Sequence, residues 1–258
     1  MNRRIIDAHI HLDHYEEDEI KQIMADLDAV DCTKLIAVSY DLASCQKNWQ
    51  LATIYSQVKP AFGFHPEQEL PSKKEQQKLF QWMEEHVNDM IAVGEIGLPY
   101  YTRKEVPALK IEGYIELLEQ FLAFAKKWDK PVVLHAVYED AGLVCDLLEK
   151  YKIRDAHFHW FKGDQKTIER MIHQGYFISI TPDVVYEQEI QALVQQYPVE
   201  LMMVETDGPW PFENPFQGEM THPQMIHESI KIIAEVKKEG LESIYQQLYQ
   251  NTGKFYRL

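Results

Sequence analysis

The stretch Ile5-Ile6-Asp7-Ala8-His9-Ile10-His11-Leu12 combines the pattern of a short apolar strand with two histidines placed two residues apart. In a β-strand, residues i and i+2 point to the same face and lie roughly 6.6–6.8 Å apart. The imidazoles of His9 and His11 can therefore converge on one metal ion. Two histidines at this spacing also arise by chance, so the pair gains its meaning from the motifs that follow it.

Short β-branched runs alternate with longer amphipathic segments along the whole chain. The predicted strands cover residues 4–10, 34–40, 60–64, 91–96, 132–135, 156–159, 176–180 and 201–205. The predicted helices cover residues 17–30, 44–57, 72–87, 109–128, 141–151, 165–174, 186–196, 223–238 and 241–257. Eight strands interleaved with helices are typical of a parallel sheet, and eight strands can close a barrel. We predict an α/β fold with a (β/α)8 TIM-type barrel; a doubly wound open sheet is the alternative.

No linker rich in Gly, Ser or Pro divides the 258 residues, so we expect one domain over residues 1–258. The least regular stretches are residues 97–107 and 208–221. Both follow a strand that carries a candidate ligand, which is where barrel enzymes build their substrate pockets.

Composition limits the class of protein and the compartment. The chain is 45% hydrophobic, which suffices for a full core, and 41 acidic against 26 basic residues leave a net charge of −15. Such a surface repels polyanions at long range. Three cysteines without a C-x-x-C pair indicate no disulfide framework or zinc knuckle, and no apolar run approaches the 18 residues of a membrane span. We therefore expect a soluble, cytoplasmic protein with no membrane partner and no obligate protein partner.

Two central strands carry ligand-type residues at their carboxyl ends. Glu95 lies in the predicted fourth strand, and His135 ends the fifth. A carboxylate inside a barrel mouth is costly unless it is paired with cations, and its two oxygens can bind two metal ions. For His135 the alternative is a core histidine with satisfied hydrogen bonds. For Glu95 the alternative is a structural ion pair with Arg3, Arg4 or Arg103.

The sixth and eighth strands each offer two candidates on one face. His157 and His159 lie two residues apart, as do Glu205 and Asp207. We expect His159 and Asp207 to be the ligands because they lie nearer the carboxyl ends, where barrel active sites form. His157 either supports a ligand or fills the barrel core. Asp207, which precedes Gly-Pro, has the alternative of a simple turn residue.

Six groups from five strands are therefore predicted to meet at the mouth, namely His9, His11, Glu95, His135, His159 and Asp207. Six ligands exceed one tetrahedral ion. With Glu95 as a bridge, His9, His11 and Asp207 would hold one ion, and His135 and His159 the other. Two ions about 3.5–4 Å apart can stabilise both the attacking and the leaving oxygen of a phosphoryl displacement. The donor set favours Zn, Mn, Fe or Ni; Mg is less well matched.

The motifs, in order, resemble those of the TatD family of metal-dependent hydrolases, within the wider amidohydrolase-like barrels. They are DAHIHL (7–12), GFHP (63–66), AVGEIGL (92–98), PVVLHA (131–136), HWFKG (159–163), VETDGP (204–209) and NTGKFY (251–256). The resemblance spans essentially the whole chain. It implies a TIM-type barrel, one or two divalent cations and phosphodiester hydrolysis. It also implies the same six ligands, with Glu95 bridging and the catalytic Asp207 beside the attacking water.

The chain departs from the family pattern near the expected substrate. Pro99 replaces an aspartate, Val137 an arginine, Glu67 a histidine, and Thr221-His222-Pro223 stands where Asn-Glu-Pro is usual. A missing arginine removes a bidentate phosphate clamp. The expected metal ligands are thus intact, whereas the substrate contacts are altered.

The predicted function is divalent-metal-dependent hydrolysis of phosphodiesters, as a deoxyribonuclease (3′–5′ exonuclease) acting on DNA ends or as a small phosphoesterase. The first alternative is an amidohydrolase or lactonase that uses the same dinuclear site on a carbonyl. The second is a non-catalytic metal-binding barrel. Substrate contacts are expected from aromatic, histidine and lysine side chains near the ligands, namely His65, Tyr100, Tyr101, Trp160, Lys162 and Trp210. For His65 the alternative is capping of its strand end.

The supply of cations near the predicted ligands limits the size of the substrate. Lys162, Arg103 and Lys104 are the cations of the motif loops. They can hold one or two phosphates but not a long tract of nucleic acid.

Overall fold

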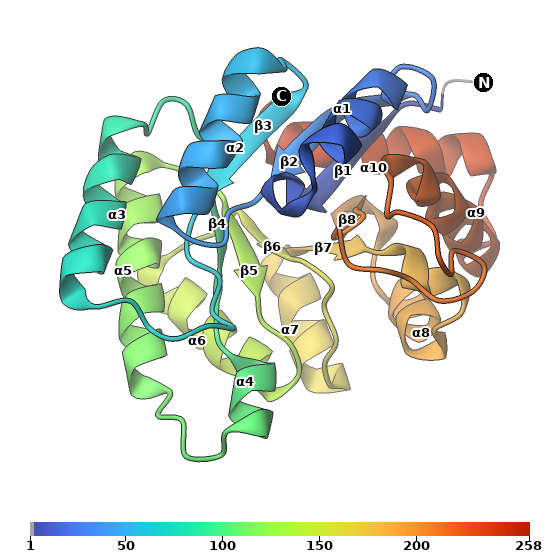
Figure 1. Ribbon diagram of the computed structural model, residues 1–258. Coiled ribbons are helices and arrows are strands. Elements are labelled where there is room, and N and C mark those ends of the chain that lie inside the picture. The colour runs from blue at the N-terminus through green and yellow to red at the C-terminus, as the bar shows by residue number, and fades with distance from the viewer. Residues whose placement is uncertain (1–2) are drawn as a thin grey trace.

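A single eight-stranded parallel sheet forms the centre of the computed structural model, which describes residues 3–258 (Figure 1). The strands pair in sequence order from β1 to β8, so the predicted (β/α)8 barrel is confirmed and the open doubly wound sheet is wrong. The strands are β1 (Ile5–Ile10), β2 (Cys32–Ala37), β3 (Val58–Phe62), β4 (Ala92–Gly97), β5 (Val132–His135), β6 (Ala156–Phe158), β7 (Phe177–Ile180) and β8 (Met202–Val204).

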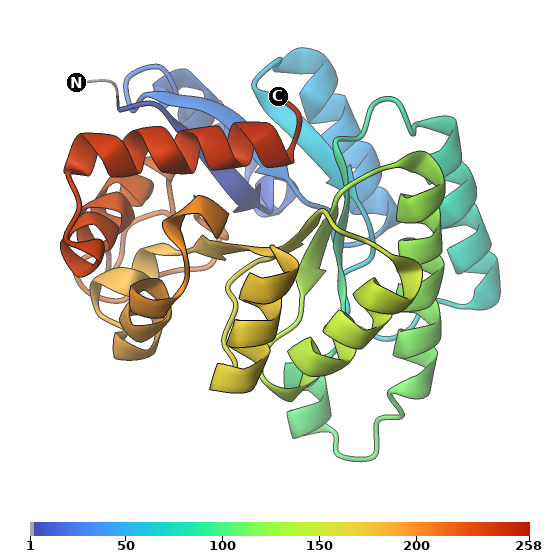
Figure 2. The same cartoon turned by 180° about the vertical axis from the view of Figure 1, so that it is seen from behind.

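Helices surround the sheet and cover its outer face, as Figures 1 and 2 show from opposite sides. They are α1 (Glu17–Asp26), α2 (Leu42–Ile54), α3 (Lys73–Glu85), α4 (Tyr100–Glu105), α5 (Glu112–Trp128), α6 (Glu139–Tyr151), α7 (Gln165–Gln174), α8 (Gln188–Gln196), α9 (Ile226–Lys237) and α10 (Leu241–Phe255). Helix α5 illustrates why they pack there. Its buried residues Tyr114, Leu117, Leu118, Phe121 and Leu122 recur at the spacing of one helix face.

The parallel register brings the carboxyl ends of the strands to one rim. Gly97 of β4 pairs with His135 of β5, and Leu134 pairs with Phe158 of β6. Between β8 and β1, backbone hydrogen bonds continue beyond Val204, the last residue of β8. There the backbone N–H of Asp207 donates to the carbonyl of His9 at 2.9 Å, and that of His11 to Gly208 at 2.8 Å. The hydrogen bonds that join the barrel at this seam therefore also place three predicted ligands.

The opposite end of the barrel is filled by the end of the chain. Phe255 and Tyr256, at the end of α10, pack against inward-pointing residues of the strands such as Ala8 and Val133. The Tyr256 hydroxyl donates to the carbonyl of Ala8 at 3.2 Å. Helix α10, red in Figure 2, thus closes the end of the barrel at which the strands begin. The rim at which the strands end is left for a site.

Helix α4 was not predicted, because six residues are too short to show a helical period. It lies in the stretch 97–107, which was expected to be irregular. No helix within residues 3–258 is long and apolar enough to cross a membrane.

Candidate metal centre

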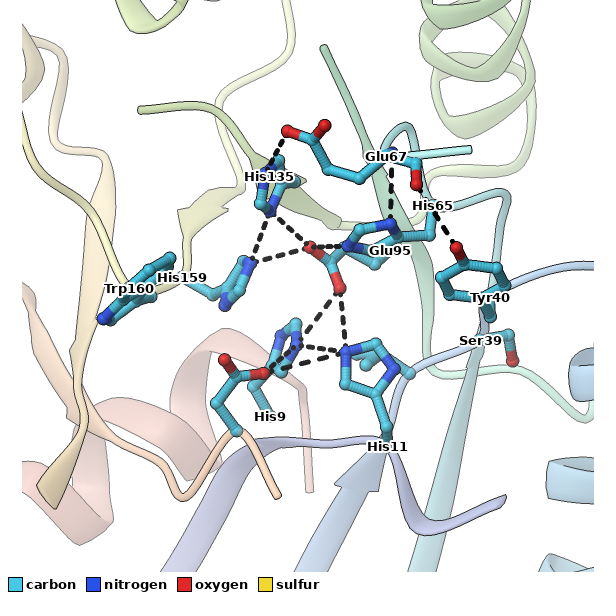
Figure 3. A network of polar contacts seen from close by, with 12 residues as sticks. His9, His11, Ser39, Tyr40, His65, Glu67, Glu95, His135, His159 and Trp160 are labelled. Atoms are coloured by element: carbon cyan, nitrogen blue, oxygen red, sulfur yellow. Dashed lines mark hydrogen bonds and ion pairs between the residues drawn. The ribbon is translucent and has the colours of Figure 1, made fainter. Parts of the chain in front are cut away.

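The six predicted ligands meet at the carboxyl-terminal rim of the barrel, around Glu95 (Figure 3). Glu95 is fully buried, and the four histidines are at most 4% exposed. Four buried imidazoles and two buried carboxylates in one place are far from the usual composition of a barrel core. The alternative ion pair of Glu95 with Arg3, Arg4 or Arg103 is wrong, because the groups that face its carboxylate are imidazoles.

One half of the centre lies at Oε2 of Glu95. The Nε2 atoms of His9 and His11 both lie 3.2 Å from this oxygen. Oδ1 of Asp207 completes the group, 3.3 Å from His9 Nε2 and 3.7 Å from His11 Nε2. The backbone of Asp207, three residues after the end of β8, has φ 52°, a left-handed conformation in which its side chain reaches the two imidazoles.

The other half lies at Oε1 of Glu95. His159 Nε2 is 2.7 Å and His135 Nδ1 3.1 Å from this oxygen, and the two ring nitrogens are 3.2 Å apart. The two halves adjoin, because the rings of His9 and His159 stack with centroids 3.9 Å apart. The structure therefore brings the six residues together around Glu95, although His9, His159 and Asp207 also form one group that can hold a metal ion, so the two halves share residues.

His65 also reaches this second half. Its Nε2 lies 3.5 Å from Glu95 Oε1, and its ring centroid lies 5.0 Å from that of His135. His65, Glu95 and His135 form one of the groups that can hold a metal ion. Burial lowers the pKa of His65 to about 3, so its imidazole is neutral and able to donate a lone pair. His65 thus points into the site and does not only cap its strand.

The electrostatics of the centre depend on contacts between imidazoles and carboxylates. Burial raises the pKa of Glu95, but the surrounding imidazoles, His159 foremost, hold it well below its usual value. Burial and His159 lower the pKa of His9, but Glu95 and Asp207 outweigh them and raise it to about 9. Negative charge on Glu95 is therefore favoured only because positive charge is held around it.

Divalent cations fit this set of residues. Both oxygens of Glu95 and Oδ1 of Asp207 are buried without a hydrogen-bond partner in the described part of the chain. They face ring nitrogens that also face one another, such as those of His9 and His11 at 3.4 Å. Lone pairs converging from imidazoles and carboxylates are the donor set of a transition metal.

Buried polar residues below the centre hold its backbone in place. Asp7 accepts hydrogen bonds from the backbone and hydroxyl of Thr206 at 3.0 and 2.5 Å, which ties β1 to the end of β8. Glu205 accepts from the Trp160 backbone at 2.9 Å and lies 3.8 Å from Nδ1 of His159. His157, for which two roles were open, lies deeper and contacts Ser179 and Tyr256 at 2.5 and 2.8 Å, so it supports the barrel core.

Glu67 lies at the centre but was not among the predicted site residues. In the sequence it stood out only as a departure from the family pattern. Its Oε1 lies 3.1 Å from Nε2 of His135 and accepts from the Tyr101 backbone at 2.9 Å. Its Oε2 accepts from the backbone and hydroxyl of Thr102 at 2.7 and 2.6 Å. Burial raises its pKa, but these hydrogen bonds outweigh burial and lower it to about 2. The one available signal was its position two residues after His65, at the carboxyl end of β3.

A cavity of about 740 Å³ opens above the centre. Of the predicted substrate contacts, His65, Tyr101, Trp160, Lys162 and Trp210 line it. Tyr100 does not, because its ring packs against Tyr101 and Tyr138 and lies under the Lys104 ammonium.

The cavity wall is acidic. Its carboxylates are Glu67, Glu105, Asp183, Glu187, Asp207 and Glu213, against Lys162 as the one lysine or arginine among the lining residues. The Lys162 ammonium lies over the Trp160 ring, 4.4 Å from its centroid. Arg103 and Lys104, which we expected to contact the substrate, pair instead with Asp140 and Glu139 of α6. The expectation that these two cations serve the substrate is therefore wrong.

Comparisons with known proteins give the same family along the whole barrel. A family model described as TatD related DNase matches residues 6–257. An uncharacterized metal-dependent hydrolase of Haemophilus influenzae is 41% identical over 255 residues, covering 98% of this chain and all of the relative. Human deoxyribonuclease TATDN3 is 26% identical over 98% of this chain and 94% of its own length. The crystal structure of the TatD homologue YjjV from Escherichia coli matches with a TM-score of 0.88 and 25% identity over the full length of both chains.

Proposed function

The chain belongs to the TatD related DNase family of metal-dependent hydrolases, and we propose that it hydrolyses phosphodiester bonds of short or small substrates with two divalent cations. The ligands would be His9, His11 and Asp207 on one side, His135 and His159 on the other, and Glu95 between them. The histidine-rich donor set favours Zn or Mn, with Fe or Ni as further candidates and Mg less well matched.

The arrangement around Glu95 carries the proposal. Its two oxygens point to two different groups of nitrogens, at distances of 2.7 to 3.2 Å. A single carboxylate that faces two clusters is suited to bridging two cations. When bound there, the cations supply charge stabilisation for both the attacking and the leaving oxygen.

The protein residues supply proton transfer and substrate positioning. Asp207 lines the cavity and has Oδ1 directed at His9 and His11, so we assign it to accept a proton from the attacking water. Lys162 can contact one phosphate at the cavity wall. The rings of Tyr101, Trp160 and Trp210 offer stacking surfaces for a base, a contact that contributes about 1–3 kcal/mol.

Hydrolysis of a carboxylic ester or amide is the second candidate, and the charge of the cavity favours it. The wall holds six carboxylates and one lysine, which disfavours a substrate with several phosphates. A lactone or amide carbonyl carries no such charge. The same centre can polarise a carbonyl oxygen, so the chemistry is available for both classes.

A substrate panel with added Mn²⁺ or Zn²⁺ separates the two candidates. We expect turnover of bis-p-nitrophenyl phosphate and of single-stranded DNA, and none of lactones or amides. Asp207→Asn should abolish this turnover, which ties it to the described centre and excludes a contaminating nuclease. Turnover of lactones or amides alone would replace the phosphodiesterase proposal by the second candidate.

The length of the substrate should be limited, because one lysine on the cavity wall can neutralise few phosphates. We expect a dinucleotide to be cleaved with higher kcat/KM than a long duplex. Raising the salt concentration should weaken DNA binding only slightly, since the slope of log affinity against log salt follows the number of neutralised phosphates, about −0.9 for each. A steep salt slope with a preference for the duplex would contradict this reading of the surface.

A further inference from the structure

The far ring nitrogens of the four central histidines are not equivalent. Nδ1 of His9, His11 and His159 has no hydrogen-bond partner within residues 3–258. In contrast, Nε2 of His135 lies 3.1 Å from a carboxylate oxygen of Glu67. A histidine that binds a metal usually donates its second ring N–H to such an acceptor, which fixes its tautomer and orientation. Among the far ring nitrogens of these four histidines, only Nε2 of His135 has a carboxylate within hydrogen-bonding distance; the nearest carboxylate oxygen to Nδ1 of His159, on Glu205, is 3.8 Å away.

Glu67 joins this histidine to the wall of the cavity. The same Oε1 that faces His135 accepts the Tyr101 backbone N–H at 2.9 Å, while Oε2 takes both donors of Thr102. These bonds hold the first turn of α4, the helix that brings Tyr101 into the cavity. The other side of α4 is held by the Lys104–Glu139 ion pair at 3.1 Å.

We propose that Glu67 is a positioning residue with two effects: it keeps the proton of His135 on Nε2 so that Nδ1 faces Glu95 and His159, and it holds the Tyr101 helix over the same centre. The inference rests on the proposed cation centre and adds a residue that neither binds the cations nor touches the reacting atoms. It gives a role to a glutamate where the family pattern has a histidine. Because one carboxylate makes both contacts, the ligand geometry and the cavity wall depend on each other.

Three variants separate the two effects. Glu67→Ala removes both contacts. Glu67→Gln is isosteric, and its amide oxygen can still accept the His135 proton, so it guards against a loss that is only a folding defect. Thr102→Val keeps the shape of α4 but removes the 2.6 Å hydroxyl bond to Glu67, and it leaves the His135 contact intact.

Cation binding is measured first, by titrating the metal-free protein with Zn²⁺ in a calorimeter. We expect Glu67→Ala to weaken the binding of one of the two Zn²⁺ equivalents about 10- to 100-fold, the usual effect of removing such a partner, and to leave the other unchanged. Glu67→Gln should lose less of its affinity for Zn²⁺ than Glu67→Ala. Thr102→Val should keep both affinities but raise KM, with kcat unchanged. Equal binding of both equivalents by the parent and Glu67→Ala would overturn the inference.

The tautomer of His135 is measured separately, from its ring ¹⁵N shifts in the metal-free protein at alkaline pH. We expect the Nε2–H form in the parent and a mixture of both forms in Glu67→Ala. If the parent takes up no cation, the proposed function fails, and the ¹⁵N shifts still decide the role of Glu67. An Nδ1–H form in the parent, or no change on substitution, would refute that role by itself.

Discussion

Replacing Glu95 by glutamine or alanine is expected to reduce kcat/KM by at least about 10³-fold, because charge stabilisation by cations is worth several kcal/mol and each 1.36 kcal/mol is tenfold in rate. Both oxygens of Glu95 face ring nitrogens and neither has a hydrogen-bond partner in the described chain. A neutral amide keeps the volume of the side chain but cannot bridge two cations. Steady-state kinetics with a p-nitrophenyl phosphodiester measures the loss.

The fold should tolerate Glu95→Gln much better than the activity does. Removing one partner of a buried ion pair is costly when the other charge is permanent. Here the partners are imidazoles, which can release their protons and become neutral. We therefore expect metal-free Glu95→Gln to unfold within a few degrees of the parent, while Glu95→Ala, which leaves a cavity, unfolds lower. Glu84→Gln, at the exposed ion pair with Lys127, is the control. Unchanged turnover in both Glu95 variants would show a structural carboxylate instead.

Removing the metal is expected to abolish hydrolysis completely and to lower the melting temperature. The purified protein should carry two transition-metal ions per chain, because each oxygen of Glu95 faces a different pair of imidazoles. A ligand that binds only the folded state at 100 times its Kd stabilises it by about 2.7 kcal/mol, so chelation removes a comparable amount for each site. Elemental analysis, activity and thermal melts before and after chelation measure all three effects.

Adding single metal ions back to the chelated protein shows which ions the centre accepts. Mn²⁺ or Zn²⁺ should restore both activity and melting temperature, whereas Ca²⁺, which prefers oxygen ligands, should restore neither. Absence of any transition metal near His9 and Glu95 after supplementation, checked by anomalous scattering, would contradict the dinuclear proposal.

Most of the barrel could be predicted from the sequence, because burial imposes a period of two or of 3.6 residues on each element. Strand 132–135 and helix 165–174 agree with the structure to the residue, and most other bounds differ by up to three residues. The second strand ends at Ala37 instead of residue 40, because beyond it the backbone of Ser39 bonds across to β4. Helix α4 could not be predicted, because six residues show no period and its start depends on a distant glutamate.

The amino-acid sequence was enough to predict where the six candidate ligands meet. Each lies at the carboxyl end of a predicted parallel strand, and such ends necessarily share one rim, so order along the chain is enough to bring His9 and Asp207 together. What those residues do remains our proposal. The six side chains cluster in space because the parallel strands bring their carboxyl ends to one rim. The number of predicted strands is enough to predict this topology.

Which side chains lie between the candidate ligands and the cavity depends on tertiary packing. Glu67 and His135 are separated by 68 residues, and their 3.1 Å contact depends on how the loop after β3 packs against the end of β5. Arg103 and Tyr100 lie close to Glu95 in sequence, yet helix α4 turns one toward Asp140 and the other away from the cavity. Loop side chains follow no strand or helix period that a sequence could report, so their partners are set by three-dimensional packing alone.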